Sequence, residues 1–105
     1  MQVNYKRPFK QYVKKAHRPL QLAILDAVET IREDSMVGEA KIGDLVGIRV
    51  YKFNFNRQEY LLAYRPRILA RNNQTDQIEF LGIDFYQVGT HENFYDTLKR
   101  YLQEE

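Results

Sequence analysis

Apolar side chains recur with the spacing of an amphipathic helix in the first third of the chain. They occupy positions 9, 12, 13 and 16, and then positions 20, 23, 24, 27, 28 and 31, which follow the i, i+3, i+4, i+7 pattern. Pro8 and Pro19 each suit the first turn of a helix, and His17-Arg18-Pro19 interrupts the run between them. The pattern predicts two helices, one beginning at Arg7 and one ending near Asp34, which form an antiparallel hairpin with apolar faces to bury.

Residues typical of β-strands dominate the middle of the chain. The segments rich in β-branched and aromatic residues are 48–55, 60–64 and 78–88, and residues 1–5 suit a short leading strand. The last of these strands is apolar enough to be central in a sheet. Residues 56–59 are a plausible turn between the first two, and residues 65–70 continue the second strand past an irregularity at Pro66, because proline cannot donate to a ladder.

Polar segments separate these elements. Residues 35–44, with turn points at Gly38 and Gly43, and residues 71–77 are predicted loops. Helical spacing returns over residues 92–102. We therefore expect a single α+β domain over residues 1–105, in which an N-terminal helical hairpin packs on an antiparallel sheet and a C-terminal helix closes the chain.

Composition excludes several function classes. The chain has no cysteine, which excludes disulfides, thiolate catalysis and cysteine-based zinc sites, and its two histidines, His17 and His91, are too few for a histidine-built metal centre. We therefore expect no metal and no cofactor. No apolar run approaches the roughly 20 residues that a membrane span needs, and the N-terminus lacks the apolar core of a secretory signal. These features predict a cytoplasmic protein without a membrane partner.

The net charge of +2 is small but unevenly distributed. Residues 1–18 contain six lysines and arginines and no acid, and residues 49–71 contain six against Glu59 alone. Such clustering favours a polyanion or an acidic protein segment as the partner.

Alternation along residues 48–55 separates two faces of the expected sheet. One face receives Ile48, Val50, Lys52 and Asn54, and the other receives Arg49, Tyr51, Phe53 and Phe55. We expect one face to cover the helices and the other to meet solvent or a ligand. Cations beside aromatic rings suit RNA, where they neutralise phosphates and stack on bases. They are equally typical of solvated strand residues and edge packing, and from the residues alone both interpretations stay open.

His91 and Tyr95 stand where the last strand gives way to the last helix. Imidazole can exchange protons near neutral pH, and Tyr95 follows one helical turn later, so the two can approach each other. The structural alternatives are a helix cap for His91 and core packing for Tyr95. On the first helix, Lys10 and Lys14 belong to a basic face that either is solvated or follows a phosphate backbone.

Together these residues resemble the RelE/ParE superfamily, the toxins of bacterial type II toxin–antitoxin modules. The similarity covers nearly the whole chain, and its most specific pieces are 47–53, 60–64 and 88–95, which read GIRVYKF, YLLAY and VGTHENFY. The resemblance implies a helical hairpin, a curved antiparallel sheet and a C-terminal helix, in that order along the chain. It also implies a toxin that a cognate antitoxin neutralises. RelE-like members cleave mRNA on the ribosome, and ParE-like members inhibit DNA gyrase.

Carried over residue by residue, the resemblance makes His91, Tyr95 and Lys52 the candidate catalytic residues. Lys52 matches a lysine of the active strand, His91 falls where that group has an arginine or histidine, and Tyr95 matches a tyrosine that stacks on or activates the substrate. Two positions depart from the pattern: Asn54 replaces a second lysine, and Leu61 replaces the central arginine that steadies the scissile phosphate.

The loss of that arginine requires another cation at the phosphate. Arg49 or Arg57 is the expected substitute, because Arg65 lies roughly 13 Å along an ideal strand from Leu61. Arg49, Arg57, Arg65, Lys10 and Lys14 are the residues expected to contact RNA. The interpretation favoured by the resemblance is a ribosome-dependent mRNA endonuclease that needs no metal, since a substrate 2′-hydroxyl is the nucleophile. The alternatives are a gyrase inhibitor and a non-catalytic RNA- or protein-binding domain of the same fold.

Overall fold

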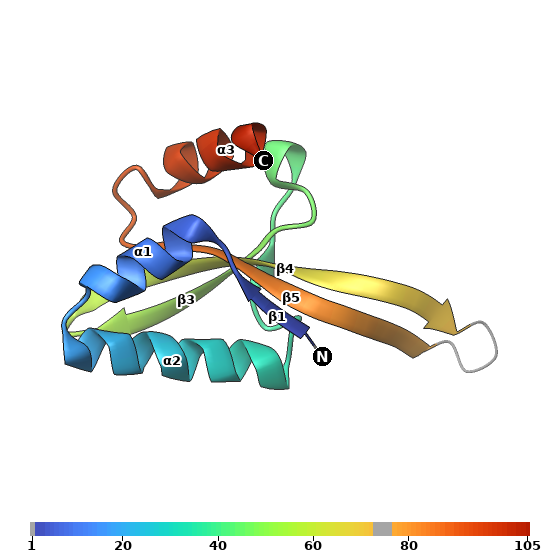
Figure 1. The fold of residues 1–105 in the computed structure, drawn as a ribbon, viewed down its shortest axis with the longest axis horizontal. Helices are drawn as coiled ribbons and strands as arrows, with labels where there is room; N and C mark the ends of the chain where they lie inside the picture. The colour runs from blue at the N-terminus through green and yellow to red at the C-terminus, as the bar shows by residue number, and fades with distance from the viewer. Residues whose placement is uncertain (1, 73–76) are drawn as a thin grey trace.

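The computed structural model describes residues 2–72 and 77–105, which form a five-stranded sheet with helices on both faces (Figure 1). In chain order the elements are β1 (Gln2–Tyr5), α1 (Arg7–Lys15), α2 (Arg18–Glu33), β2 (Glu39–Ala40), the 3₁₀ turn η1 (Gly43–Leu45), β3 (Arg49–Phe55), β4 (Gln58–Asn72), β5 (Gln77–Gly89) and α3 (Phe94–Glu104). The strand order is β1-β5-β4-β3-β2. The predicted α+β fold of hairpin, sheet and closing helix is confirmed.

One strand pair differs from the antiparallel expectation. β1 runs parallel to β5, with Val3 opposite Ile83, while the other neighbouring strands are antiparallel. β5 therefore lies inside the sheet, as its apolar sequence predicted. The parallel pair requires a close approach at Gly82, where an added Cβ would lie 2.2 Å from the carbonyl oxygen of Gln2.

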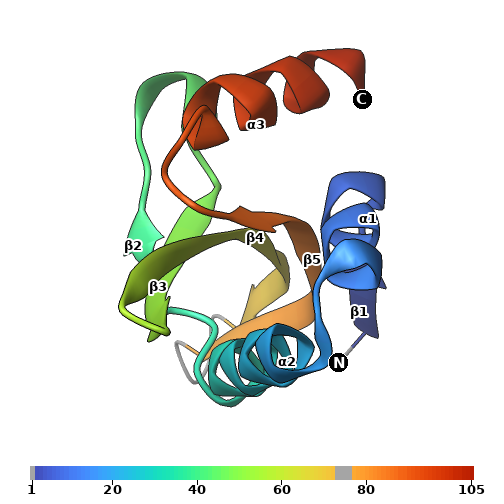
Figure 2. The same cartoon turned by 90° about the vertical axis from the view of Figure 1, so that its left-hand side faces the viewer.

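The helical hairpin covers one face of the sheet, here called the hairpin face. α1 packs mainly on β5 and α2 on β3, and Figure 2 shows both helices on the same side of the strands. The buried residues of this face are Phe9, Leu20, Ile24, Ala27, Val28, Ile31, Leu62, Tyr64, Ile83, Phe85 and Val88. Every buried position of the two helices belongs to the apolar pattern seen in the sequence, because burying that stripe is what holds the helices on the sheet.

The opposite face, here called the α3 face, is partly covered by α3 and η1 (Figure 2). Its buried residues are Leu45, Ile48, Val50, Leu61, Ala63, Tyr86, Phe94 and Leu98. The expectation that helices cover only one face is therefore wrong for this half of the sheet. Along β3 and the residue before it, the same face changes from the buried Ile48 and Val50 to the exposed Lys52 and Asn54, so the open part of the face begins at Lys52.

Several element boundaries differ from the prediction. β2 lies within the segment 35–44 that was predicted as a loop, and the hairpin turn contains only Asn56 and Arg57, with φ values of 49° and 64°. Two positive φ values are typical of the tight turn that matches strand twist. β4 begins at Gln58, which places Glu59 in a strand rather than in a turn.

β4 and β5 continue beyond their neighbours as a two-stranded ribbon (Figure 1). Pro66 stays in register opposite Ile83, and the irregularities lie elsewhere, at Ala63/Tyr64 and on both sides of Ile68. Pro66 fits because β3 ends its pairing opposite Tyr64, which leaves this part of β4 with an open edge. The predicted loop 71–77 is shorter at both ends, and its residues 73–76 lie outside the described residues.

Candidate active site

The open part of the α3 face is built from rows of residues that cross three strands. Lys52, Leu61 and Gly89 lie side by side on β3, β4 and β5. Leu61 is fully buried and forms the floor, while Lys52 is exposed. The next row toward the hairpin turn pairs Asn54 with Glu59. Successive rows on one face are about 7 Å apart along a strand, so these side chains share one surface.

His91 reaches this surface from the segment that joins β5 to α3. Its Nε2 donates to Oε1 of Glu59 at 2.5 Å. Because an ionised carboxylate only accepts hydrogen bonds, Nε2 carries the proton in this contact, and Nδ1 is the ring nitrogen left open to a substrate. The side chains of His91 and Glu59 are 52% and 39% exposed, so the pair adds little to folding stability.

Tyr95, on the first turn of α3, lies at the other end of the surface. Nζ of Lys41 stands 5.4 Å from the centre of the Tyr95 ring and 2.8 Å from Oε1 of Glu39. The hydrogen bond from Lys41 lowers the pKa of Glu39, and the positive charge of Lys52 lowers it further. The hydrogen bond to Glu39 raises the pKa of Lys41, with a smaller contribution from Tyr95. Lys52 therefore lies on β3 between the two contacts, His91–Glu59 and Tyr95–Lys41.

Buried polar contacts hold the start of α3 in place above the sheet. Nε2 of the buried Gln87 donates to the carbonyl of Phe94 at 2.8 Å, and the side chain of Phe94 is itself buried. Asn93 precedes the helix with a φ of 57°, a conformation that asparagine tolerates better than most residues. His91 and Tyr95 lie on either side of Phe94 in the chain, so the anchored Phe94 determines where both side chains leave the backbone.

The two arginines expected to replace the missing cation lie away from Leu61. Arg49 is on the hairpin face, where its guanidinium donates to the carbonyls of Gly38 at 2.8 Å and Met36 at 2.9 Å. These bonds hold the chain between α2 and β2. Arg57 is exposed at the tip of the β3–β4 turn. Neither guanidinium lies on the α3 face next to Leu61, and the contacts of both residues with RNA stay predictions.

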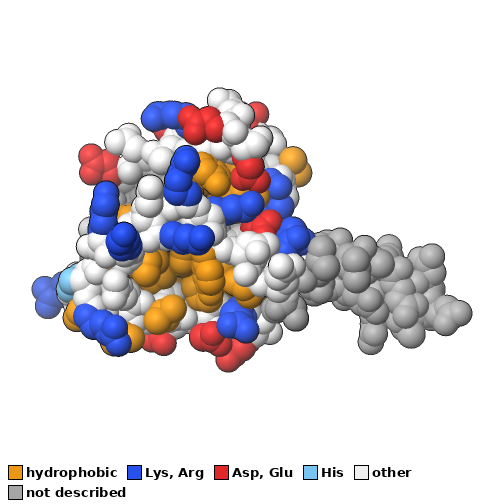
Figure 3. Space-filling view, in the orientation of Figure 1, with side chains coloured by type: hydrophobic (Ala, Val, Ile, Leu, Met, Phe, Trp, Pro, Cys, Tyr) orange, Lys and Arg blue, Asp and Glu red, His pale blue; other side chains and the backbone are white. Residues whose placement is uncertain are grey.

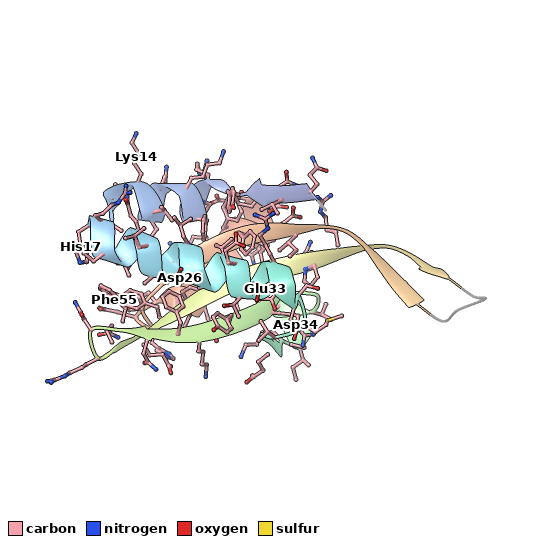
Figure 4. All side chains as sticks on the ribbon, turned by 90° about the horizontal axis from the view of Figure 1, so that it is seen from below. Lys14, His17, Asp26, Glu33, Asp34 and Phe55 are labelled. Atoms are coloured by element: carbon pink, nitrogen blue, oxygen red, sulfur yellow. The ribbon has the colours of Figure 1, made fainter. Side chains whose placement is uncertain are left out.

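The remaining predicted RNA contacts lie in two other places. Arg65 is on the α3 face, but it stacks on Tyr86, with 5.5 Å from its guanidinium carbon to the ring centre. Lys10 and Lys14 are on α1, where they border a hollow of about 310 Å³ next to Phe9 and Val13. Figure 3 shows Lys and Arg side chains bordering an apolar patch on this side of the molecule, and in Figure 4 Lys14 points away from the sheet.

His17, the second histidine, belongs to the hairpin face. Its ring packs edge-on against Phe55 at the end of β3, with 5.8 Å between ring centres (Figure 4). It lies at the junction of α1 and α2, on the opposite side of the sheet from His91. The two histidines therefore have different surroundings, and only His91 has a carboxylate partner among the described residues.

Glu39, Lys41 and Glu59 were not singled out as site residues from the sequence. Glu39 and Lys41 fall in the predicted loop, although the alternation of polar and apolar residues over 39–42 is a signal for a short strand that puts both on one face. Glu59 falls in the predicted turn. The signal that could have placed it is Asn56, because asparagine favours the positive φ of a two-residue hairpin turn.

Neither a metal-binding cluster nor a helix able to cross a bilayer occurs in the part of the chain that the structure describes. No group of three or more His, Cys, Asp or Glu side chains is close enough there to hold a metal ion. Each helix in this part is too short or too polar to span a membrane.

Comparison with protein families identifies the class of protein. A family model for the ParE-like toxin of type II bacterial toxin–antitoxin systems matches residues 3–99. The chain therefore belongs to this ParE-like toxin family, in agreement with the resemblance seen in the sequence. Neither the comparison with curated proteins nor that with solved structures finds a significant match. Membership in a type II family implies a cognate antitoxin as a partner.

Proposed function

We propose that this toxin arrests translation by cleaving mRNA on the ribosome, and that its cognate antitoxin blocks the cleavage. The observation that carries the proposal is the grouping of Lys52, the His91–Glu59 pair and Tyr95 on one open surface around Leu61. The exposed pair of His91 and Glu59 adds little to stability, so it is available for a chemical role.

The reaction consists of an attack by the substrate 2′-hydroxyl on the adjacent phosphorus. The 2′-oxygen–phosphorus bond forms and the bond from phosphorus to the 5′-oxygen breaks, which gives a cyclic phosphate and a free 5′-hydroxyl. Nδ1 of His91 takes the proton of the 2′-hydroxyl, and water returns a proton to the leaving oxygen. The carboxylate of Glu59 stabilises the imidazolium, and Lys52 offsets the charge that develops on the phosphate.

Tyr95 supplies an aromatic surface at the other end of the site from His91, beyond Lys52. Base stacking on such a ring is tolerant of sequence, because every base has a π-face. In this proposal the ring orients the nucleotide while His91 and Lys52 act on the phosphate. No metal ion is needed in this chemistry, since the substrate provides its own nucleophile.

Inhibition of DNA gyrase is the second candidate function, and the match to a ParE-like family favours it. The resemblance links ParE-like members to gyrase without a chemical motif to match. In that case the same surface would contact a protein, His91 would not need to move a proton, and Lys52 would not need to offset charge on a phosphate.

Expression of the chain in bacteria separates the two functions. On the nuclease proposal, growth stops, amino-acid incorporation falls before DNA synthesis, and translated mRNA carries cuts at codon-spaced positions. Co-expression of the neighbouring antitoxin gene relieves the arrest. Failure of DNA synthesis first, with altered supercoiling and intact mRNA, would replace the nuclease by the gyrase inhibitor.

The two histidines offer a matched pair of variants for this experiment. His91→Ala removes the proposed base, whereas His17→Ala removes a ring that packs on Phe55 on the other face. We expect His91→Ala to abolish the arrest and His17→Ala to retain it at equal soluble expression. Equal toxicity of the two variants contradicts the assignment of His91.

A further inference from the structure

Three charged side chains lie in a line along the outer edge of the α3 face. Lys41 and Glu39 alternate with Ala40, and Glu39 is directly opposite Val50, so that Glu39 shares a face with Val50 and Lys52. The backbone N–H of Lys41 bonds to the carbonyl of Ile48 at 2.9 Å, which continues the pairing one residue past β2. The order along the edge is therefore Lys41, Glu39, Lys52.

The carboxylate of Glu39 forms an ion pair with Lys41 and lies in the electrostatic field of Lys52. Oε1 of Glu39 is 2.8 Å from Nζ of Lys41. Lys52 lies on β3, two residues beyond the partner of Glu39, and is therefore the diagonal neighbour of Glu39 on the same face. The positive charge of Lys52 lowers the pKa of Glu39. The side chain of Glu39 is 67% exposed, so this anion sits between two cations at a position that solvent and ligands can reach.

This arrangement adds little to the stability of the fold. β2 contains only two residues, and exposed ion pairs contribute little to folding because water screens them. A carboxylate between two lysines does, however, occupy the position that a phosphate would take. Nζ of Lys41 stands over the Tyr95 ring, so the ring lies next to any phosphate that Lys41 binds.

We propose that Lys41 and Lys52 form a subsite for a phosphate of single-stranded RNA, and that Glu39 occupies this subsite in the free protein. The proposal rests on the proposed function in taking RNA as the substrate. It adds Lys41 to the cations that contact the RNA backbone. It also makes Glu39 a competitor of the substrate, because Lys41 must release the carboxylate before it binds the phosphate.

Binding of a short RNA that cannot be cleaved tests this subsite separately from catalysis. The probe is a fluorescent single-stranded RNA with 2′-O-methyl groups, and its affinity is measured by anisotropy at several salt concentrations. We expect Lys41→Gln to weaken binding by about threefold or more and to reduce the salt slope by about 0.7, the value for one phosphate contact on a single strand. Glu39→Gln should strengthen binding by a similar factor.

The ion pair between Glu29 and Arg32 is a matched control. It is also an exposed surface pair, at 3.3 Å, but it lies on α2 on the other side of the sheet. Glu29→Gln and Glu39→Gln change the net charge equally, so a specific effect must appear only at Glu39. In addition, the gain from Glu39→Gln should disappear when Lys41 and Lys52 are both replaced by Gln.

The outcomes separate this inference from the proposed function. Lysine-dependent binding of the uncleavable RNA supports the subsite even when no variant of the chain cleaves mRNA. An equal gain from Glu29→Gln, an unchanged affinity in Lys41→Gln, or a loss in Glu39→Gln overturns it, even when mRNA cleavage is observed. Binding of single-stranded DNA with the same lysine dependence and higher affinity than RNA also overturns it, because the ligand would then be DNA.

Discussion

The hydroxyl of Tyr64 donates a hydrogen bond to the carbonyl of Ser35 at 2.8 Å. The same hydroxyl accepts one from the backbone N–H of Gly38 at 2.9 Å. Tyr64 is fully buried on the hairpin face of β4, so it connects the core to the segment after α2. That segment leads into β2, and its position therefore fixes Glu39 and Lys41 at the edge of the α3 face.

Removal of this hydroxyl should destabilise the protein without opening a large cavity. In Tyr64→Phe the carbonyl of Ser35 and the N–H of Gly38 lose their partner, at a cost of about 1–3 kcal/mol in the free energy of unfolding. Urea denaturation measures the change. An unchanged midpoint would mean that water replaces both bonds and that the segment is held by other contacts, such as those of Arg49.

Substitutions at the site should divide into chemical and positioning effects. On the nuclease proposal, His91→Ala and Lys52→Ala each lower cleavage by about 10²-fold or more, the scale for losing a positioned acid, base or charge. Glu59→Ala should lower kcat and leave KM nearly unchanged, because Glu59 contacts His91 rather than the substrate. Glu59→Gln keeps an acceptor for Nε2 and should recover part of the loss.

Nitrogen NMR of the imidazoles checks the same assignment without any substrate. With only two histidines in the chain, His17→Ala leaves the His91 signals alone in the spectrum. We expect the proton on Nε2 in the wild type and in Glu59→Gln, and a changed Nε2 shift in Glu59→Ala. Identical spectra for all three proteins would contradict the contact between His91 and Glu59.

Tyr86 should make the protein less stable at alkaline pH. Burial raises the pKa of Tyr86 to about 12, with smaller contributions from Glu105 and Asp84, while the charge of Arg65 acts in the opposite direction. The unfolded phenol ionises near its ordinary pKa of 10.0. The folded state thus holds its proton more tightly, so this contribution to stability is complete below that pH and is lost as the pH rises toward 12.

Urea denaturation at about pH 8 and about pH 11 measures this loss. We expect Tyr86→Phe to lose less stability than the wild type between the two values, because phenylalanine does not ionise. The difference should be on the order of 1 kcal/mol, since one pKa unit corresponds to about 1.4 kcal/mol. Equal losses in both proteins would show that other groups cause the alkaline sensitivity.

Two glycines in β5 should respond differently to alanine. In Gly82→Ala the new Cβ meets the backbone oxygen of Gln2 at 2.2 Å, so β1 must move away from β5. In Gly89→Ala the nearest atoms are side-chain carbons of Tyr12 and Phe94 at 3.5 and 3.9 Å, which are ordinary contacts. We expect a loss of about 1–3 kcal/mol for Gly82→Ala and less than about 1 kcal/mol for Gly89→Ala. Thermal unfolding with hydrogen exchange at β1 tests both.

The helical hairpin was predictable because its signal is local. The apolar stripe of α2 repeats over the length of one helix. Burial of that stripe is the main reason why the helix forms, so the spacing of apolar residues in the sequence is enough to predict it. The same holds for α1, with Pro8 in its first turn. The central position of β5 was also predictable, since a strand with partners on both sides and helices above and below has few places for polar residues.

The candidate site was less predictable because it depends on pairings between distant residues. Nothing near Tyr95 in the chain indicates that Lys41 will stand over its ring, and nothing near His91 indicates Glu59. These contacts follow from two facts that periodicity does not report: α3 packs on the face opposite the hairpin, and the β3–β4 turn contains two residues. A turn of two residues rather than four moves Glu59 into the strand and onto the α3 face.

The irregularity at Tyr86 limits how the length of this chain can change during evolution. Ala63 and Tyr64 are adjacent on β4, but their partners on β5, Gln87 and Phe85, are separated by Tyr86. The extra residue lets Tyr86 and Gln87 share a face, so that Phe85 and Val88 both enter the hairpin-face core. Relatives that lack one residue here must either pair β5 without the irregularity or exchange the faces of everything beyond it. Length differences among relatives should therefore fall in turns, and the spacing from Phe85 to His91 should be among the least variable in the family.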